Sequence, residues 1–205
     1  MTSHALDKVD LSPFLRAAAA AMRAGGVAGS ADMARRLEAH ADARSSAHLR
    51  DGHAGKLPAL AHLATTLVAT GHLPCIDLVA PIAHRLDWTE GDFVMPESFR
   101  GRYAFVTLVG EGAAIPDSEI YFGLYLQSPD TFYPSHWHAA EEIYTVLSGT
   151  ALWQRGKDAF APKPPGSQIL HLTYEPHAMD TKAEPLLAMW SWTGEIHGDT
   201  YEIET

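Results

Sequence analysis

The spacing of apolar residues in the first 90 positions is typical of helices. Leu60, Leu63, Ala64, Leu67 and Val68 recur at intervals of three and four, which predicts a helix that begins near Pro58 and ends at Gly71. Ser12 followed by Pro13 is a favourable pair for a helix start, and Gly25-Gly26 is a favourable stop. We therefore predict helices that begin at Ser12, at Ser30 and near Pro58.

After Trp88 the pattern changes to short runs of β-branched and aromatic residues separated by Gly, Pro and Asp. No long helical pattern interrupts these runs, which argues against a parallel sheet with crossover helices. Seven or more short strands at this spacing favour an antiparallel sandwich or barrel. The predicted strands are Tyr103–Val109, Ile120–Leu126, Phe132–His138, Glu142–Leu147, Thr150–Arg155, Gln168–Tyr174 and Leu186–Thr193.

The change of pattern divides the chain of 205 residues into two parts. Residues 1–91 form a helical segment, which we expect to cover one end of the barrel. Residues 92–205 form the β-barrel domain. A composition of 46% hydrophobic and 20% charged residues is that of an ordinary globular protein. A run of about 18 apolar residues is absent, so we expect no membrane span.

All of the net charge of −10 lies in the second part. Residues 92–205 contain six Lys and Arg against sixteen Asp and Glu, whereas the first part is balanced at nine of each. This acidic half would repel nucleic acid and favours a cationic ligand or a metal ion. Solubility is the simpler interpretation, and Glu195, Asp199, Glu202 and Glu204 lie in a tail that we expect to have no other role.

A single cysteine, Cys75, excludes an internal disulfide framework and a cysteine-rich zinc module. We interpret it as a buried spectator. The first eight residues lack a basic region followed by an apolar one, so we expect no secretory signal and a cytoplasmic location.

The segment from Tyr133 to Tyr144 carries the candidate chemistry. His136 and His138 point to one face of their predicted strand, as do Glu142 and Tyr144 of the next, because side chains alternate along a strand. If the chain bends at Ala139-Ala140, these faces converge inside the barrel. Two imidazoles and a carboxylate form a suitable site for a divalent first-row metal. A buried His–Glu hydrogen-bond network and a surface histidine pair are the alternatives.

The spacing His136-x-His138-x3-Glu142-x6-Gly149 resembles the first metal motif of the cupin superfamily. The resemblance implies a double-stranded β-helix, or jelly roll. The second cupin motif is present only in part, because the third residue after Pro164-Pro165-Gly166 is Ile169, where a histidine is usual. The remaining histidine ligand is then His171 or His177.

Within the cupins, the chain between Phe132 and Trp192 resembles the cupin-type dimethylsulfoniopropionate (DMSP) lyases, most of all the Q class, with the L class a near neighbour. The resemblance rests on Tyr133, the motif above, Glu175-Pro176-His177 and Trp190-x-Trp192. It implies one divalent ion of iron, zinc or manganese, held by His138, Glu142 and His177. It also implies that Tyr144 is close enough to ligate. His136 is a further possible ligand. The substrate-binding residues that it implies are His136, Tyr133, Trp192 and Trp190.

The activity implied by the resemblance is β-elimination of DMSP, a zwitterionic sulfonium compound, to dimethyl sulfide and acrylate. Tyr144 or Tyr133 would be the base. Lowering the pKa of a phenol by about 2–3 units takes roughly 3–4 kcal/mol, which a nearby dication can supply. A cupin dioxygenase that uses iron and O₂, and a non-catalytic cupin that senses a ligand or metal, remain the alternatives. Barrels of this class often pair through edge strands, so a homodimer stays open.

Overall fold

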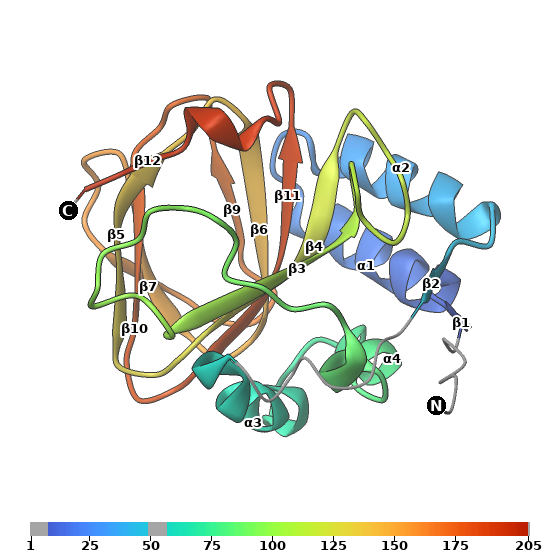
Figure 1. Ribbon diagram of the computed structural model, residues 1–205, viewed down its shortest axis with the longest axis horizontal. Coiled ribbons are helices and arrows are strands. Elements are labelled where there is room, and N and C mark those ends of the chain that lie inside the picture. The colour runs from blue at the N-terminus through green and yellow to red at the C-terminus, as the bar shows by residue number, and fades with distance from the viewer. Residues whose placement is uncertain (1–7, 49–56, 205) are drawn as a thin grey trace, which may run out of the picture.

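The computed structural model of the protein describes residues 8–48 and 57–204. The N-terminal residues on which the expectation of no secretory signal rests lie almost entirely outside this part. Most of the described chain forms a barrel of two facing antiparallel sheets, with α1 (Ser12–Gly25) and α2 (Ser30–Asp42) to its right and α3 (Leu63–Val68) beneath it in Figure 1. No helix among the described residues is long and apolar enough to span a bilayer.

The first sheet has the strand order β3-β4-β11-β6-β9 and the second the order β12-β5-β10-β7-β8. Consecutive strands alternate between the two sheets from β4 to β7, and β9, β10 and β11 return between them. This is the topology of a jelly roll, so the predicted cupin double-stranded β-helix is confirmed. The strands of the barrel are β3 (Tyr103–Val109), β4 (Tyr121–Gln127), β5 (Thr131–Trp137), β6 (Glu141–Ser148), β7 (Ala151–Arg155), β8 (Ala161–Lys163), β9 (Gln168–His171), β10 (His177–Thr181), β11 (Leu186–Thr193) and β12 (Glu202–Ile203).

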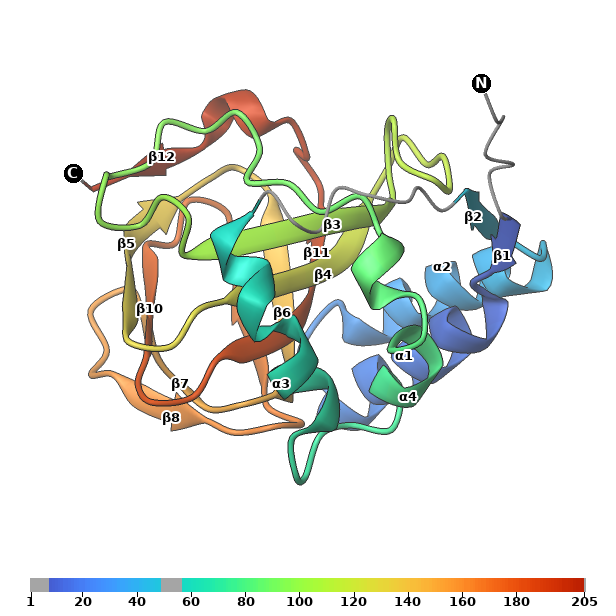
Figure 2. The ribbon, with the colours of Figure 1, turned by 60° about the horizontal axis from the view of Figure 1, so that its bottom comes forward.

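The first two helices of the helical segment pack on the outer face of the first sheet. The whole segment contains α1, α2, α3 and α4 (Ile76–Val79), with a small two-stranded sheet of β1 (Lys8–Asp10) and β2 (Ser46–His48). Side chains of α1 and α2 share one apolar cluster with outward-facing residues of β4, β6 and β11. Figure 2 brings α3 and α4 forward, with α3 in front of the barrel and α4 in front of α1. The predicted third helix is a 3-10 turn at Pro58–His62 that continues into α3.

Burial on both faces explains the long apolar runs of the first sheet. Along β6, Ile143, Thr145 and Leu147 face the helices, while Glu142 and Tyr144 face the barrel interior. A strand buried on both sides has no need of polar alternation. The second sheet has a more exposed outer face, so β5 alternates, with Phe132 exposed between the buried Thr131 and Tyr133.

Gly149 makes the turn that follows β6, at the glycine position of the cupin motif. Its φ of +77° lies in the left-handed region, and a Cβ atom there would stand 2.0 Å from the carbonyl oxygen of Pro185. Only glycine meets both conditions without strain. The turn returns the chain to the second sheet and fixes how far β6 extends into the barrel.

Candidate metal and active site

The residues singled out in the sequence gather inside one end of the barrel. The bend at Ala139-Ala140 separates β5 from β6, as predicted, and brings His138, which directly follows β5, toward Glu142. All of the predicted site side chains are buried, namely Tyr133, His136, His138, Glu142, Tyr144, His177, Trp190 and Trp192.

His138, Glu142 and His177 form the compact group of ligand atoms. One ligand atom from each lies within 4.8 Å of the other two. The Nε2 atoms of His138 and His177 both lie 3.3 Å from Oε2 of Glu142. Of the two histidines left open by the sequence, His177 therefore reaches this carboxylate.

Backbone carbonyls orient the histidine rings. Nδ1 of His138 lies 3.0 Å from the carbonyl oxygen of Ala140, and Nδ1 of His177 lies 2.8 Å from that of Glu175. Each Nδ1–H donates to its carbonyl, so in the neutral ring the lone pair lies on Nε2. This is the usual arrangement around a metal-binding histidine.

When both rings are neutral, no proton or cation lies between the ligand atoms of His138, Glu142 and His177. The Nε2 lone pairs and the carboxylate oxygen, all hydrogen-bond acceptors, face one another, and Nε2 of His177 is buried without a hydrogen-bond partner. Burial opposes ionisation of Glu142, but hydrogen bonds and positive charge from His138 and His177 in their protonated form outweigh it and hold the pKa of Glu142 well below its ordinary value. A cation among these three atoms would satisfy all of them. The donor set therefore fits a divalent transition metal.

His136 and His171 lie beside this group and are not members of it. The ring of His136 stacks on Tyr133 with centroids 3.9 Å apart, and its Nδ1 lies 2.9 Å from the carbonyl oxygen of Pro134. The ring of His171 stacks on that of His177 at 3.8 Å, and its Nε2 accepts a hydrogen bond from the indole of Trp153. Burial lowers the pKa of both histidines well below the ordinary value.

Tyr144 stands next to the carboxylate of the group. The carboxylate of Glu142 is close enough for its charge to act on the phenol. Burial raises the pKa of Tyr144 well above its ordinary value, and the charge of Glu142 adds to this effect. In the metal-free site Tyr144 is therefore a protonated phenol, which agrees with the expectation that a phenol needs a nearby cation to become a base.

Tyr133 is the second predicted base. Its hydroxyl lies 2.7 Å from that of Tyr201. Burial raises its pKa well above the ordinary value, and the surrounding tyrosines contribute in the same direction. Tyr133 therefore faces other phenols, whereas Tyr144 faces the carboxylate.

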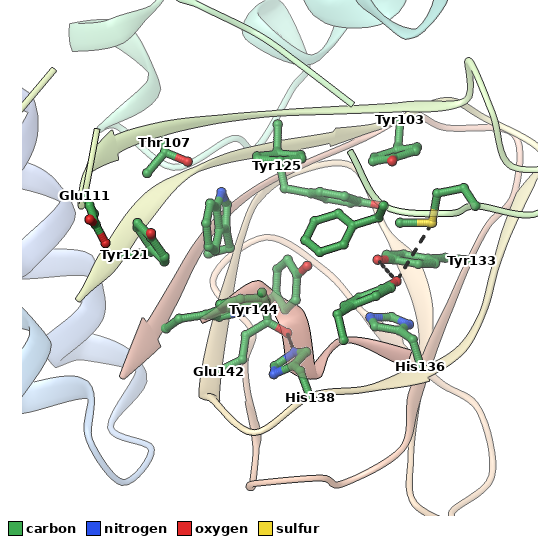
Figure 3. A pocket seen from close by; sticks show the side chains of 17 residues that line it. Tyr103, Thr107, Glu111, Tyr121, Tyr125, Tyr133, His136, His138, Glu142 and Tyr144 are labelled. Carbon is green, nitrogen blue, oxygen red and sulfur yellow. Dashed lines mark hydrogen bonds and ion pairs between the residues drawn. The ribbon is translucent and has the colours of Figure 1, made fainter. Parts of the chain in front are cut away.

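A cavity of about 280 Å³ opens beside the group (Figure 3). Its lining contains ten aromatic residues and two acids, Glu111 and Glu142, but no Lys or Arg among the described residues. Both predicted tryptophans line it. The aromatic lining consists of Phe93, Tyr103, Phe105, Tyr121, Tyr125, Tyr133, Tyr144, Trp190, Trp192 and Tyr201.

The C-terminal tail closes one wall of the cavity, so the expectation that this tail has no role beyond solubility is wrong, although its four acidic side chains are exposed. Glu202 pairs with Trp137 of β5, and the neighbouring Tyr201 lines the cavity. The hydroxyl of Thr200 accepts a hydrogen bond from the backbone N–H of Ala139, at the bend between β5 and β6. No sequence pattern marks Tyr201, whereas Tyr121 and Tyr125 share a face of β4 and could have been found by strand parity.

Cys75 lies in the helical segment and is buried. Burial raises the pKa of its thiol to about 11. A thiol with such a pKa is a poor nucleophile at neutral pH, which agrees with a spectator role.

Comparison with known proteins decides the family. A sequence model of the dimethylsulfoniopropionate lyase family matches residues 29–188. The chain belongs to this family. The match includes every predicted site residue except Trp190 and Trp192, and it also includes α2, so the family resemblance extends into the helical segment.

Relatives within the DMSP lyase family agree with this assignment. The chain is 31% identical over 98 residues to dimethylsulfoniopropionate lyase DddQ of Ruegeria pomeroyi, and the alignment spans 48% of this chain and 49% of that one. The matched segment is thus about half the length of the curated relative. The crystal structure of DddQ from Ruegeria pomeroyi DSS-3 is 26% identical with a TM-score of 0.60, over 71% of this chain and 75% of that one. A structure from the work on the DMSP lyases RdDddP and RnDddQII is 24% identical with a TM-score of 0.71, over 95% and 97%. The last similarity shows that the fold extends over nearly the whole chain.

Proposed function

We propose that the protein is a metal-dependent DMSP lyase that converts DMSP to dimethyl sulfide and acrylate. The observation that carries the proposal is the position of Tyr144. Its phenol lies beside a carboxylate of a three-residue donor group and lines an aromatic cavity. Membership of the DMSP lyase family supports the same activity.

His138, Glu142 and His177 would hold the metal, with Tyr144 as an additional ligand and His136 beside them. When bound, a divalent ion supplies Lewis acidity toward the carboxylate of the substrate and stabilises the phenolate form of a nearby tyrosine. Iron, zinc and manganese all suit this donor set.

The tyrosine performs the proton transfer. The oxygen of Tyr144 removes a proton from the carbon next to the substrate carboxylate. The electron pair of that C–H bond forms the carbon–carbon double bond of acrylate. The bond from the neighbouring carbon to sulfur breaks, and its electrons leave on sulfur as neutral dimethyl sulfide. Tyr133, which faces the same cavity, is the alternative base.

The walls of the cavity bind the substrate. A sulfonium is a permanent cation with apolar methyl groups, and each aromatic face attracts such a group by roughly 0.5–2 kcal/mol, depending on desolvation. Trp190 and Trp192 line the cavity from β11, while Tyr133 and His136 line it from β5. Because the described lining contains no Lys or Arg, no basic side chain there repels the sulfonium.

Headspace gas chromatography tests the proposal. Protein loaded with one equivalent of iron, zinc or manganese should release dimethyl sulfide and equimolar acrylate from millimolar DMSP, and chelator-treated protein should not. Stoichiometric metal without dimethyl sulfide release from any of the three forms would refute the proposal.

Two histidines and one carboxylate are also the donor set of non-haem iron oxygenases. This observation favours a dioxygenase as the second candidate. A dioxygenase consumes O₂ and is inactive without it, whereas elimination proceeds at the same rate under anaerobic conditions.

A further inference from the structure

The cavity has a second carboxylate, far from the donor group. Glu111 lines the cavity and is exposed to solvent. Figure 3 shows Glu111 beside Tyr121 and Thr107, at the end of the cavity away from His136 and His138. Of the two acids of the lining, Glu111 therefore marks one end of the space, while Glu142 lies beside His138.

Aromatic rings lie between the two ends. The ring of Tyr121 lies 6.4 Å from those of both Trp190 and Trp192, and Phe105 meets Trp190 edge to face at 5.8 Å. Aromatic faces and a carboxylate both attract a positive charge. Because no Lys or Arg is found among the described lining residues, nothing in this lining neutralises Glu111.

The loop that carries Glu111 is held in place by its own backbone. Gly110 donates its N–H to the carbonyl of Ile115 and accepts hydrogen bonds from Ala113 and Asp117. The N–H of Ile115 in turn bonds to Leu108. These bonds fix the position of the loop relative to the end of β3.

Helix α2 supports the same loop from outside the barrel. Arg36 donates to Glu119 at 2.7 Å, and Nε2 of His40 lies 2.8 Å from Asp117. These contacts give the helical segment a defined connection with the mouth of the cavity.

We propose that Glu111 determines specificity at the mouth of the cavity. Its carboxylate, next to Tyr121, attracts the cationic end of a short zwitterion as the ligand enters the cavity and moves toward His138, Glu142 and His177. It also repels ligands that carry a second carboxylate. This inference rests on the proposed function for the identity of the substrate, and its test separates the two.

Steady-state kinetics of Glu111→Gln test the proposal. An exposed charge contact is worth about a two- to fivefold change in affinity, so KM for DMSP should rise by about two- to fivefold at low ionic strength, with kcat unchanged. The difference in KM between Glu111→Gln and wild type should shrink at about 0.5 M salt, because salt screens the attraction between Glu111 and the substrate cation. Glu184→Gln makes the same change of charge in the exposed turn between β10 and β11, outside the described lining, and should leave KM unchanged.

Inhibitors of matched shape separate charge from packing. Isocaproate has a neutral CH in place of the sulfonium, so its inhibition constant should be the same in wild type and Glu111→Gln. Succinate carries a second carboxylate and should inhibit Glu111→Lys more strongly than wild type. Equal KM values for Glu111→Gln and Glu184→Gln, or an equal loss of isocaproate and DMSP affinity in Glu111→Gln, would overturn the inference.

Titration calorimetry measures ligand binding directly, so it tests the role of Glu111 even if the protein does not turn over DMSP. The trimethylammonium analogue of DMSP should bind wild-type protein more tightly than it binds Glu111→Gln, whereas isocaproate should not distinguish the two. If wild type binds the analogue in this way but releases no dimethyl sulfide, the proposed function fails and the role of Glu111 stands. If dimethyl sulfide is released and the analogue does not distinguish the two proteins, the role of Glu111 fails alone.

Discussion

The indole N–H of Trp192 donates a hydrogen bond to Oε1 of Glu142 at 2.8 Å. The two residues are register partners on β11 and β6. This bond occupies one oxygen of the carboxylate and leaves Oε2 facing His138 and His177. Trp192 is thus both a wall of the cavity and a support for a candidate metal ligand.

Replacing Trp192 by Phe should weaken metal binding by about 10- to 100-fold, since loss of a hydrogen bond to a ligand typically has an effect of this size. The affinity is measured by competition with a chelating dye. Trp190→Phe is the matched control, because Trp190 lies on the same strand and cavity but its indole N–H has no hydrogen-bond partner. Equal affinities of the two variants would contradict the role assigned to Trp192.

His177 and His171 provide a direct test of the ligand set. We predict that His177→Gln abolishes stoichiometric metal binding, because Nε2 of His177 faces Glu142. His171→Phe should retain the metal, since Phe preserves the ring stacked on His177 and His171 lies outside the compact group. Elemental analysis of the purified variants measures their metal content. Loss of metal from His171→Phe but not from His177→Gln would show that the ligand was assigned to the wrong histidine.

The stability of the metal-free protein should fall as pH decreases from 7 to 5. His136 and His171 have lowered pKa values because they are buried, so they stay neutral in the folded state. In the unfolded chain they take up protons below about pH 6.5, which favours unfolding by up to about 1.36 kcal/mol per pH unit for each histidine. The lowered pKa of Glu142 acts in the same direction at lower pH.

Urea midpoints between pH 7 and pH 5 measure this dependence. His171→Phe should reduce the dependence of stability on pH by the contribution of one histidine. This holds whatever the substitution does to stability at pH 7. A wild-type midpoint that does not change over this range would show that these histidines are protonated in the folded protein.

Strand parity and the bend at Ala139-Ala140 were sufficient to predict that His138 and Glu142 converge. Both features are local, and local periodicity is the property that sequence patterns report best. The third histidine was different. Only the resemblance favoured His177 over His171, because β10 (His177–Thr181) was not recognised as a strand. Its residues His-Ala-Met-Asp-Thr have no clear alternation, since most of them are buried.

The position of the helices and the C-terminal wall could not be derived from periodicity. The residues on the outward face of β6 are mostly apolar, so the sequence predicts that this face is buried. It does not reveal whether α1 or a second sheet covers the face. Tyr201 reaches the cavity only because β12, a strand of two residues, pairs with β5. Such a contact depends on the tertiary structure alone. The boundary at residues 91 and 92 stays a prediction, and the bridge between Thr89 and Phe105 joins the two parts just before it.

The central claim is that one phenol, Tyr144, beside the donor group of His138, Glu142 and His177, removes the proton. The most direct test is the rate of dimethyl sulfide release by metal-loaded Tyr144→Phe, measured together with its metal content. The account predicts a fall in kcat of about 10²- to 10⁴-fold, the usual contribution of a general base, with metal content near that of wild type. A variant that keeps its metal and releases dimethyl sulfide at the wild-type rate would contradict the account.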